Sequence, residues 1–321
     1  MKIGKLKWGV RMGMKRSMWV LLLGMLWLAP VGLQAQTGEI ELAERYFNDG
    51  DFESALALYV KFQKQDPTSR LFNQRVAMSY EKLERNEDGI KFLDKVIKKN
   101  PEDNLYPIFN ADQLRLNGDL EGATALETKT IEKDLRTEAD FLEIGAFLYQ
   151  ADKTALALRT YQEARSTLKD KYLFGSEIAN LLPLAGEDAA ATEEYLTQMK
   201  VGLMPFSQAK LSILNLVEEY NREQIEPVLL ASVQKNSDNI QLRTIVFEYY
   251  VLTEEFYEAY VQVKSIDKVN KEDGRRVYNY ALTLRNNQEY RLSNKALDYI
   301  IENRERSAYY LLAYQEKSVN N

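Results

Sequence analysis

The sequence predicts an all-α fold built from stacked helical hairpins, and three observations support this. Small residues recur at a fixed interval, so that Ala43 corresponds to Ala77, 34 residues later. Within each interval the apolar residues stand three or four apart, as on one face of a helix. Gly50 falls where a first helix should end, and Pro67 and Pro101, again 34 apart, fall where a second helix should end.

The frame continues without gaps when residue 36 is taken as position 1. Positions 8 and 20 carry small residues, position 15 favours glycine, positions 11 and 24 favour aromatic residues, and position 32 carries proline in the first two units. Small residues at 8 and 20 let the two helices of a hairpin approach closely. The residues that define the frame are Ala43, Tyr46, Gly50, Ala55, Tyr59, Pro67, Ala77, Tyr80, Pro101, Ala111, Gly118, Ala123, Gly145, Ala157, Tyr161, Ala179, Gly186, Ala191 and Tyr195.

This pattern resembles the tetratricopeptide repeat (TPR). The resemblance implies a right-handed α-superhelix, or solenoid, of helix–turn–helix units, each of which buries its apolar faces only by stacking on its neighbours. The whole chain is similar to exported, multi-repeat TPR proteins of Gram-negative envelopes, which implies a role in binding other proteins.

Residues 1–35 have the features of a secretory signal peptide. Lys2 to Arg16 contains six basic residues, an apolar run from Met18 to Leu28 follows, and Ala35 is a small residue at the expected cleavage site. The alternative is an uncleaved anchor, but the run is shorter than the ~20 residues of a comfortable span. We therefore expect cleavage near Ala35–Gln36, export to the periplasm, and no integral membrane segment afterwards.

Residues 36–205 contain five clear units. The third has Asn110 and Glu127 at positions that are usually apolar, and in the fifth Pro183 should kink or shorten the first helix. Residues 206–307 are expected to form three degenerate units in the same frame, with Ile213 and Ile225 where small residues belong.

Residues 308–321 are expected to form one more helix of the first type. A terminal capping helix should show a polar outer face, but this one is rich in Tyr and Leu. Two alternatives remain open: the apolar side packs wholly on the eighth unit, or the chain is the front part of a longer superhelix.

Composition excludes most chemistry. The chain has no His and no Cys, so neither a catalytic triad nor a zinc site of the usual kinds can form. Without the six basic residues of the leader, 36 basic and 48 acidic residues leave a net charge of −12, which disfavours nucleic-acid binding. We expect no enzymatic activity, no cofactor and no metal site.

The remaining candidate is the concave groove, which the TPR resemblance places at positions 2, 5, 9 and 12 of the first helices. Apolar residues there would dock a helix or an extended peptide, or else would pack against neighbouring first helices. The function predicted is a protein-interaction scaffold. A domain associated with peptidoglycan or carbohydrate, and a structural spacer, are the alternatives. The predicted groove residues are Phe47, Leu71, Met78, Leu105, Ile108, Leu142, Tyr149 and Leu173.

Overall fold

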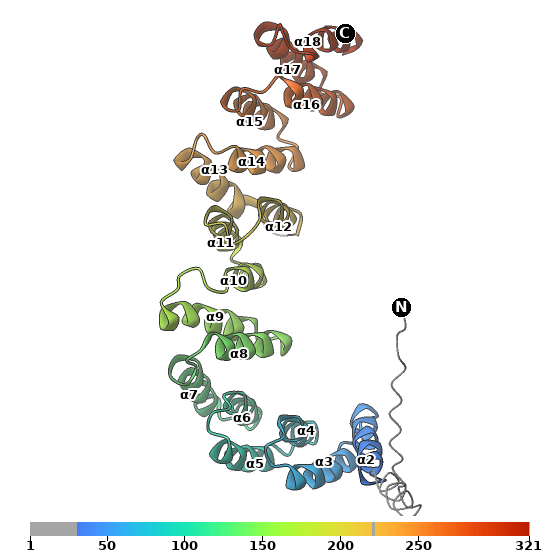
Figure 1. Ribbon diagram of the computed structural model, residues 1–321, viewed down its shortest axis with the longest axis vertical. Coiled ribbons are helices and arrows are strands. Elements are labelled where there is room, and N and C mark those ends of the chain that lie inside the picture. The colour runs from blue at the N-terminus through green and yellow to red at the C-terminus, as the bar shows by residue number, and fades with distance from the viewer. Residues whose placement is uncertain (1–30, 220–221, 321) are drawn as a thin grey trace, which may run out of the picture. The chain divides into compact units, whose positions relative to one another are not determined.

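The computed structural model describes residues 31–219 and 222–320. Over these ranges helices are the regular secondary structure, and consecutive helices pair as antiparallel hairpins (Figure 1). The predicted all-α stack of helix–turn–helix units is therefore confirmed. The first 30 residues of the predicted signal peptide lie outside the described residues.

The described chain forms two compact units, divided between Thr130 and Ile131. The first contains the hairpins from α2 onward, and the π-helical turn Thr130–Asp134 follows its last helix. Its helices are α2 (Val31–Asn48), α3 (Phe52–Gln65), α4 (Arg70–Lys82), α5 (Asn86–Lys99), α6 (Leu105–Leu116) and α7 (Leu120–Lys129). The expected cleavage site lies within α2.

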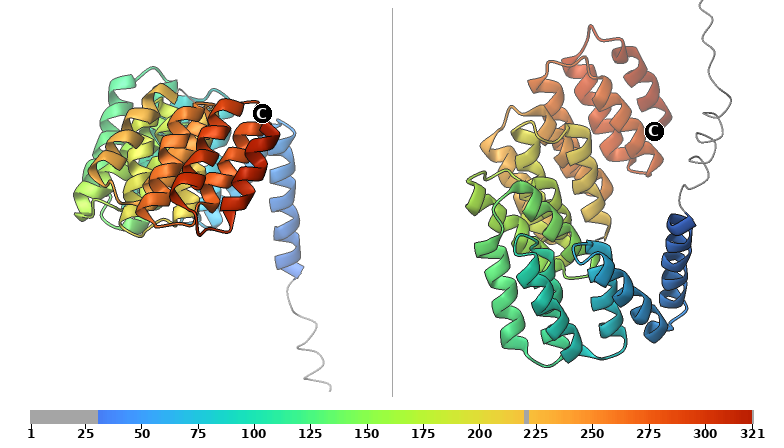
Figure 2. Two further views of the ribbon diagram at one scale, coloured as in Figure 1. Left: turned by 90° about the horizontal axis from the view of Figure 1, so that it is seen from above. Right: turned by 60° about the horizontal axis from the view of Figure 1, so that its bottom comes forward.

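The second unit is the longer of the two. In Figure 1 the first helices of its hairpins α12–α13, α14–α15 and α16–α17 lie on one side and the second helices on the other. Figure 2 shows the same helices in two further views. Its helices are α8 (Glu138–Gln150), α9 (Thr154–Leu168), α10 (Gly175–Leu181), α11 (Asp188–Lys200), α12 (Phe206–Glu219), α13 (Ile225–Lys235), α14 (Ile240–Leu252), α15 (Phe256–Val269), α16 (Arg275–Asn286), α17 (Tyr290–Asn303) and α18 (Tyr309–Asn320).

Small residues at positions 8 and 20 lie where the two helices of a hairpin touch. Ala43 and Ala55 are fully buried in the first hairpin, as are Ala281 at position 8 and Ala259 at position 20 in later ones. The two helices also approach closely at Gly145, where an added Cβ atom would lie 2.5 Å from the ring of Tyr161.

The turn between the helices has one recurring conformation. Position 15 adopts a positive φ in all seven units in which it is described, whether or not the residue is glycine. The φ values are 84°, 88° and 78° at Gly50, Gly118 and Gly186, and 55°, 58°, 61° and 65° at Glu84, Asp152, Glu254 and Gln288. The conformation is imposed by the packing of the two helices, since a non-glycine residue disfavours it.

Polar residues at apolar positions of the third unit are paired rather than expelled. Buried Asn110 donates a hydrogen bond to Asp94 at 3.0 Å, and buried Glu127 accepts two from the guanidinium of Arg115 at 2.9 and 2.8 Å. Such pairing offsets much of the cost of burying polar groups. Near Pro183, α10 ends after seven residues and a 3-10 turn replaces its last part, as expected for proline.

Candidate binding groove

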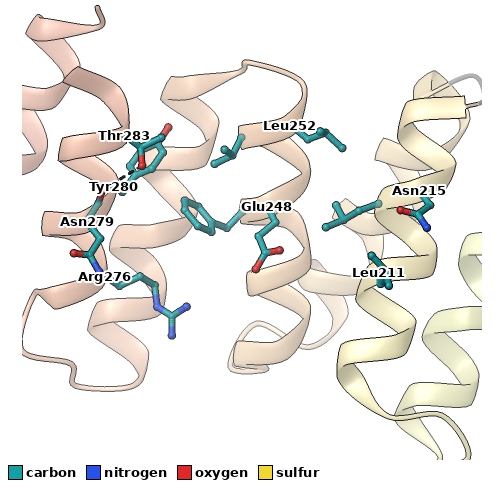
Figure 3. Close-up of a pocket in the computed structure, with 11 residues that line it drawn as sticks. Leu211, Asn215, Glu248, Leu252, Arg276, Asn279, Tyr280 and Thr283 are labelled. Atoms are coloured by element: carbon teal, nitrogen blue, oxygen red, sulfur yellow. Dashed lines mark hydrogen bonds between the residues drawn. The ribbon is translucent and has the colours of Figure 1, made fainter. Parts of the chain in front are cut away.

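A groove with a cavity volume of about 560 Å³ opens across three consecutive first helices of the second unit, α12, α14 and α16. Figure 3 shows these helices side by side, with Leu211 and Asn215 on α12, Glu248 and Leu252 on α14, and Arg276 and Asn279 on α16. Its lining residues are Leu211, Leu214, Asn215, Phe247, Glu248, Val251, Leu252, Arg276, Asn279, Tyr280 and Thr283. Just over half of them are apolar or aromatic.

The aromatic rings of Phe247 and Tyr280 form the floor of the groove, and contacts with the rest of the stack fix their positions. The rings of Phe247 and Tyr280 meet edge to face, with centroids 5.2 Å apart, and the Tyr280 hydroxyl donates to the carbonyl oxygen of Phe256 at 2.7 Å. Burial raises the pKa of Tyr280 well above its usual value, so this hydroxyl stays a donor at physiological pH. Leu211, by contrast, is 60% exposed and Leu252 is 39% exposed. The groove thus offers free apolar surface on a rigid support.

The charged residues of the groove already have partners. Glu248 pairs with Lys210 at 2.7 Å, and Arg276 pairs with Glu272 at 3.1 Å. Burial would raise the pKa of Glu272, but hydrogen bonds from Arg276 and Asn270 outweigh it and lower that pKa. Because each charge is compensated locally, the groove has no net attraction for a small ion, and apolar contact is its main means of binding.

The comparisons with known proteins find similarity only at the level of fold. No protein-family model matches the chain, and no curated protein matches its sequence. A chain of the Naa15/Naa10 complex bound to HypK-THB matches at 12% identity and a TM-score of 0.33, over 86% of this chain and 43% of that one. The C-terminal part of a TPR repeat-containing protein from Cytophaga hutchinsonii matches at 15% identity and a TM-score of 0.32, over 72% of this chain and 95% of that one.

The TPR2AB domain of yeast Sti1, in a complex with pHSP90, matches at 13% identity and a TM-score of 0.31, over 90% of this chain and 99% of that one. In this chain itself the helix pairs recur with a spacing of 34 residues. The fold is that of a tetratricopeptide-repeat solenoid. The chain spans 43% of the Naa15/Naa10 chain, the first of these similar structures.

Two of the residues predicted to line a TPR groove are not available to a ligand. Leu105 is 4% exposed and Ile108 is fully buried, so their assignment to the groove is wrong. They belong to α6, which packs against both α5 and α7. The alternative, packing against neighbouring first helices, stays a prediction for these two residues.

Three others are partly covered. Phe47 contacts the rings of Phe52 and Tyr59, at centroid distances of 5.3 and 6.4 Å, and the Arg75 guanidinium lies 4.9 Å from its ring centroid. Its ring therefore contributes to the hairpin core as well as to the surface. Met78 and Leu173 are half-buried.

The remaining three predicted residues are exposed. Leu71 on α4 is 46% exposed, while Leu142 and Tyr149, on α8, are 44% and 51% exposed. Leu142 and Tyr149 are seven residues apart and so lie on the same face of α8. Their role as ligand contacts stays a prediction.

Sequence reasoning missed the groove on α12, α14 and α16, because the repeat pattern of residues 206–307 is weak. The signal was present. Of the six residues at positions 9 and 12 of these units, three line the groove: Leu214, Glu248 and Val251.

Two other observations concern the described residues only. No helix among them is both long and apolar enough to span a bilayer. No group of three or more Asp and Glu side chains among them is arranged to hold a metal ion.

Proposed function

We propose that this chain is a non-enzymatic protein-interaction scaffold that binds an apolar helix or extended peptide in the groove on α12, α14 and α16. The observation that supports this most directly is the exposure of Leu211 and Leu252 beside a fixed aromatic floor. Large apolar side chains held exposed in one concave region are typical of sites that bind another protein.

The composition of the groove favours a peptide over a small polar ligand. Complete burial of one leucine side chain contributes about 1.5–3 kcal/mol, so contacts to Leu211, Leu252 and Val251 supply the main affinity. The side-chain amides of Asn215 and Asn279 each offer donors and an acceptor. They are suited to the peptide groups of a ligand, while the apolar floor accepts its side chains.

Export to the cell envelope is part of this proposal. It rests on the basic and apolar leader at residues 1–35 and on the net charge of −12 that remains without it. The partner we propose is an envelope protein or peptide, rather than nucleic acid or a membrane surface. N-terminal sequencing of the protein recovered from the periplasm tests this point: Gln36 as first residue is expected, and an intact leader on that protein would contradict it.

Peptide binding is tested by selecting ligands from a random peptide library on the wild-type protein and measuring their affinity by fluorescence anisotropy. Leu211→Asp should weaken binding at least tenfold, or about 1.4 kcal/mol, since it places a charge on the apolar surface. Leu203→Asp is the matched control, because Leu203 is 61% exposed but lies outside the groove.

Far-UV circular dichroism confirms that both variants remain helical. Equal affinity for wild type and Leu211→Asp would refute the groove as the binding site. If muropeptides rather than unrelated peptides displace the selected ligands, the carbohydrate-associated alternative replaces the scaffold. Phe47→Ala is unsuitable here, because Phe47 also packs in a hairpin core.

A further inference from the structure

A second cavity, with a volume of about 250 Å³, opens between α11 and α13, the second helices of consecutive hairpins. These two helices pack on each other, and the cavity shares no lining residue with the groove on α12, α14 and α16. Its walls combine apolar side chains with hydroxyl and charged groups. Its lining residues are Glu193, Leu196, Thr197, Lys200, Val228, Ala231, Ser232 and Lys235.

Two ammonium groups line this cavity without a carboxylate partner. Lys200 and Lys235 are the last residues of α11 and α13. The Lys200 ammonium donates a hydrogen bond to the Ser232 hydroxyl at 2.8 Å, and no carboxylate in the described part of the chain forms an ion pair with either lysine. Burial and the nearby charge of Lys235 lower the pKa of Lys200, as expected where two like charges meet. An anion between the two lysines would neutralise both.

Each helix adds a hydroxyl beside its lysine. Thr197 precedes Lys200 by three residues on α11, and Ser232 precedes Lys235 by three residues on α13. On each helix the hydroxyl and the ammonium therefore share one face. Ser232 is 7% exposed, and its oxygen accepts from Lys200, which leaves its own O–H to donate. Hydrogen-bond donors from both helices thus converge on one space.

We propose that this cavity binds the phosphate group of a phosphomonoester. Such a group carries a charge of about −1.5 to −2 near pH 7, which matches two ammonium groups, whereas a carboxylate would compensate one of them. The phosphate oxygens accept charge-assisted hydrogen bonds from Lys200 and Lys235, and a further hydrogen bond from the Ser232 hydroxyl. This site goes beyond the peptide groove and does not depend on it.

The rest of the cavity selects what the phosphate is attached to. Leu196, Val228 and Ala231 provide an apolar wall, and the volume of about 250 Å³ leaves room for a small organic group beside the phosphate. Glu193 lies seven residues before Lys200, about 10 Å away along the axis of α11. At that distance it does not pair with Lys200, but it would repel a second phosphate. We therefore expect selectivity for small esters with a single phosphate group.

The test measures the protection of lysine amines in the full-length protein. Trace acetylation of each lysine is followed by mass spectrometry at one low ionic strength, set with chloride, acetate, inorganic phosphate or glycerol phosphate, because salt screens exposed charges. Glycerol phosphate should slow acetylation of Lys200 and Lys235 at least threefold relative to chloride, and acetate should not. Lys99 is the internal control, because it is also exposed and is the last residue of a second helix, α5.

A pair of variants separates the site from general effects of charge. Lys235→Gln should abolish the protection of Lys200. Lys99→Gln removes the same charge from an equivalent helix position and should leave that protection unchanged. Both positions are exposed, so neither substitution should affect folding. Protection is expressed as the ratio of rates without and with glycerol phosphate, so that a change in the intrinsic reactivity of Lys200 cancels.

Selective protection of Lys200 and Lys235 by glycerol phosphate, lost in Lys235→Gln, would support the site. Absence of protection, equal protection of Lys99, equal protection by acetate, or protection that survives in Lys235→Gln would overturn it. Equal protection by inorganic phosphate would overturn the ester as ligand and assign the cavity to free phosphate. The result is independent of the groove on α12, α14 and α16, because no groove residue is changed.

Discussion

The deepest buried charge of the second unit offers a test of how the hairpins α14–α15 and α16–α17 are joined. Asp267 on α15 is fully buried. It accepts hydrogen bonds from Arg304 Nη2 at 2.6 Å, from the Tyr299 hydroxyl at 2.8 Å and from the Gly274 N–H at 2.9 Å. One carboxylate thus links α15, the turn before α16, and the end of α17. We predict that Asp267→Ala loosens this junction.

The size of the effect follows from the groups left behind. Removing one partner of a buried ion pair costs about 3–5 kcal/mol. The Arg304 side chain is 24% exposed and can turn partly toward water, whereas the Gly274 N–H and the Tyr299 O–H lose the acceptor of their hydrogen bonds. We therefore expect about 3 kcal/mol. Asp267→Asn keeps the shape and one acceptor oxygen, so it should cost about half as much.

A repeat stack unfolds locally as well as globally, so amide hydrogen exchange is the suitable assay. Exchange in α16 and α17 should accelerate about a hundredfold, since 1.4 kcal/mol is a factor of ten. Amides of α8 and α9, which do not contact Asp267, are the internal control. Acceleration of less than tenfold, or equal acceleration in α8 and α9, would refute the idea that this carboxylate holds the junction.

Two further predictions concern the fourth unit, and both are checked by urea unfolding. Gly145→Ala should destabilise it by about 1–3 kcal/mol, because the new methyl overlaps the Tyr161 ring. The control is Gly38→Ala. Gly38 is a helical glycine at which an added Cβ atom would meet nothing within 4 Å, so this substitution should stabilise the protein by up to ~1 kcal/mol. Equal effects of the two substitutions would refute the close contact. Burial alone would raise the pKa of Asp140, but hydrogen bonds from Thr137 and Arg136 lower it below its usual 3.8. The lowered pKa means that this carboxylate stabilises the fold fully above about pH 5, and that the stabilisation is lost as pH falls through the folded-state pKa. Asp140→Asn should then destabilise at pH 7 but hardly at all once the carboxyl is protonated, and a pH-independent effect would contradict this.

Much of the fold could be predicted from residues whose role is local. Ala157 and Tyr161 occupy positions 20 and 24 of their unit. Because they are four residues apart, they lie on the same face of the second helix, the face that contacts the first helix. The 34-residue frame holds even in the sixth unit, where Ile213 occupies position 8 in place of a small residue and is fully buried. The division between Thr130 and Ile131 could not be predicted, because it depends on which hairpins pack most tightly on each other.

The candidate groove was harder to predict than the fold. Leu105 and Ile108 stand at positions 2 and 5 of their unit, as expected for groove residues, but their exposure depends on how α6 packs against its neighbouring helices. Leu211 and Leu252 stand at positions 6 and 13 of weak units, where neither the repeat pattern nor hydrophobicity separates a ligand contact from a packing residue. Sequence periodicity predicts on which face of a helix a residue lies. Whether that face is covered or lines an open groove depends on how three helices pack together.

The left-handed residue at position 15 has an evolutionary consequence. Glu84, Asp152, Glu254 and Gln288 hold the same turn as the glycines of other units, at a cost of about 1–2 kcal/mol each. If the free energy of unfolding of the whole stack exceeds this cost, glycine at position 15 can be replaced in one unit after another while every hairpin keeps its shape. The residues at consensus positions then change before the backbone conformation does. This is consistent with the present chain, whose helices follow the TPR frame although no family model matches its residues.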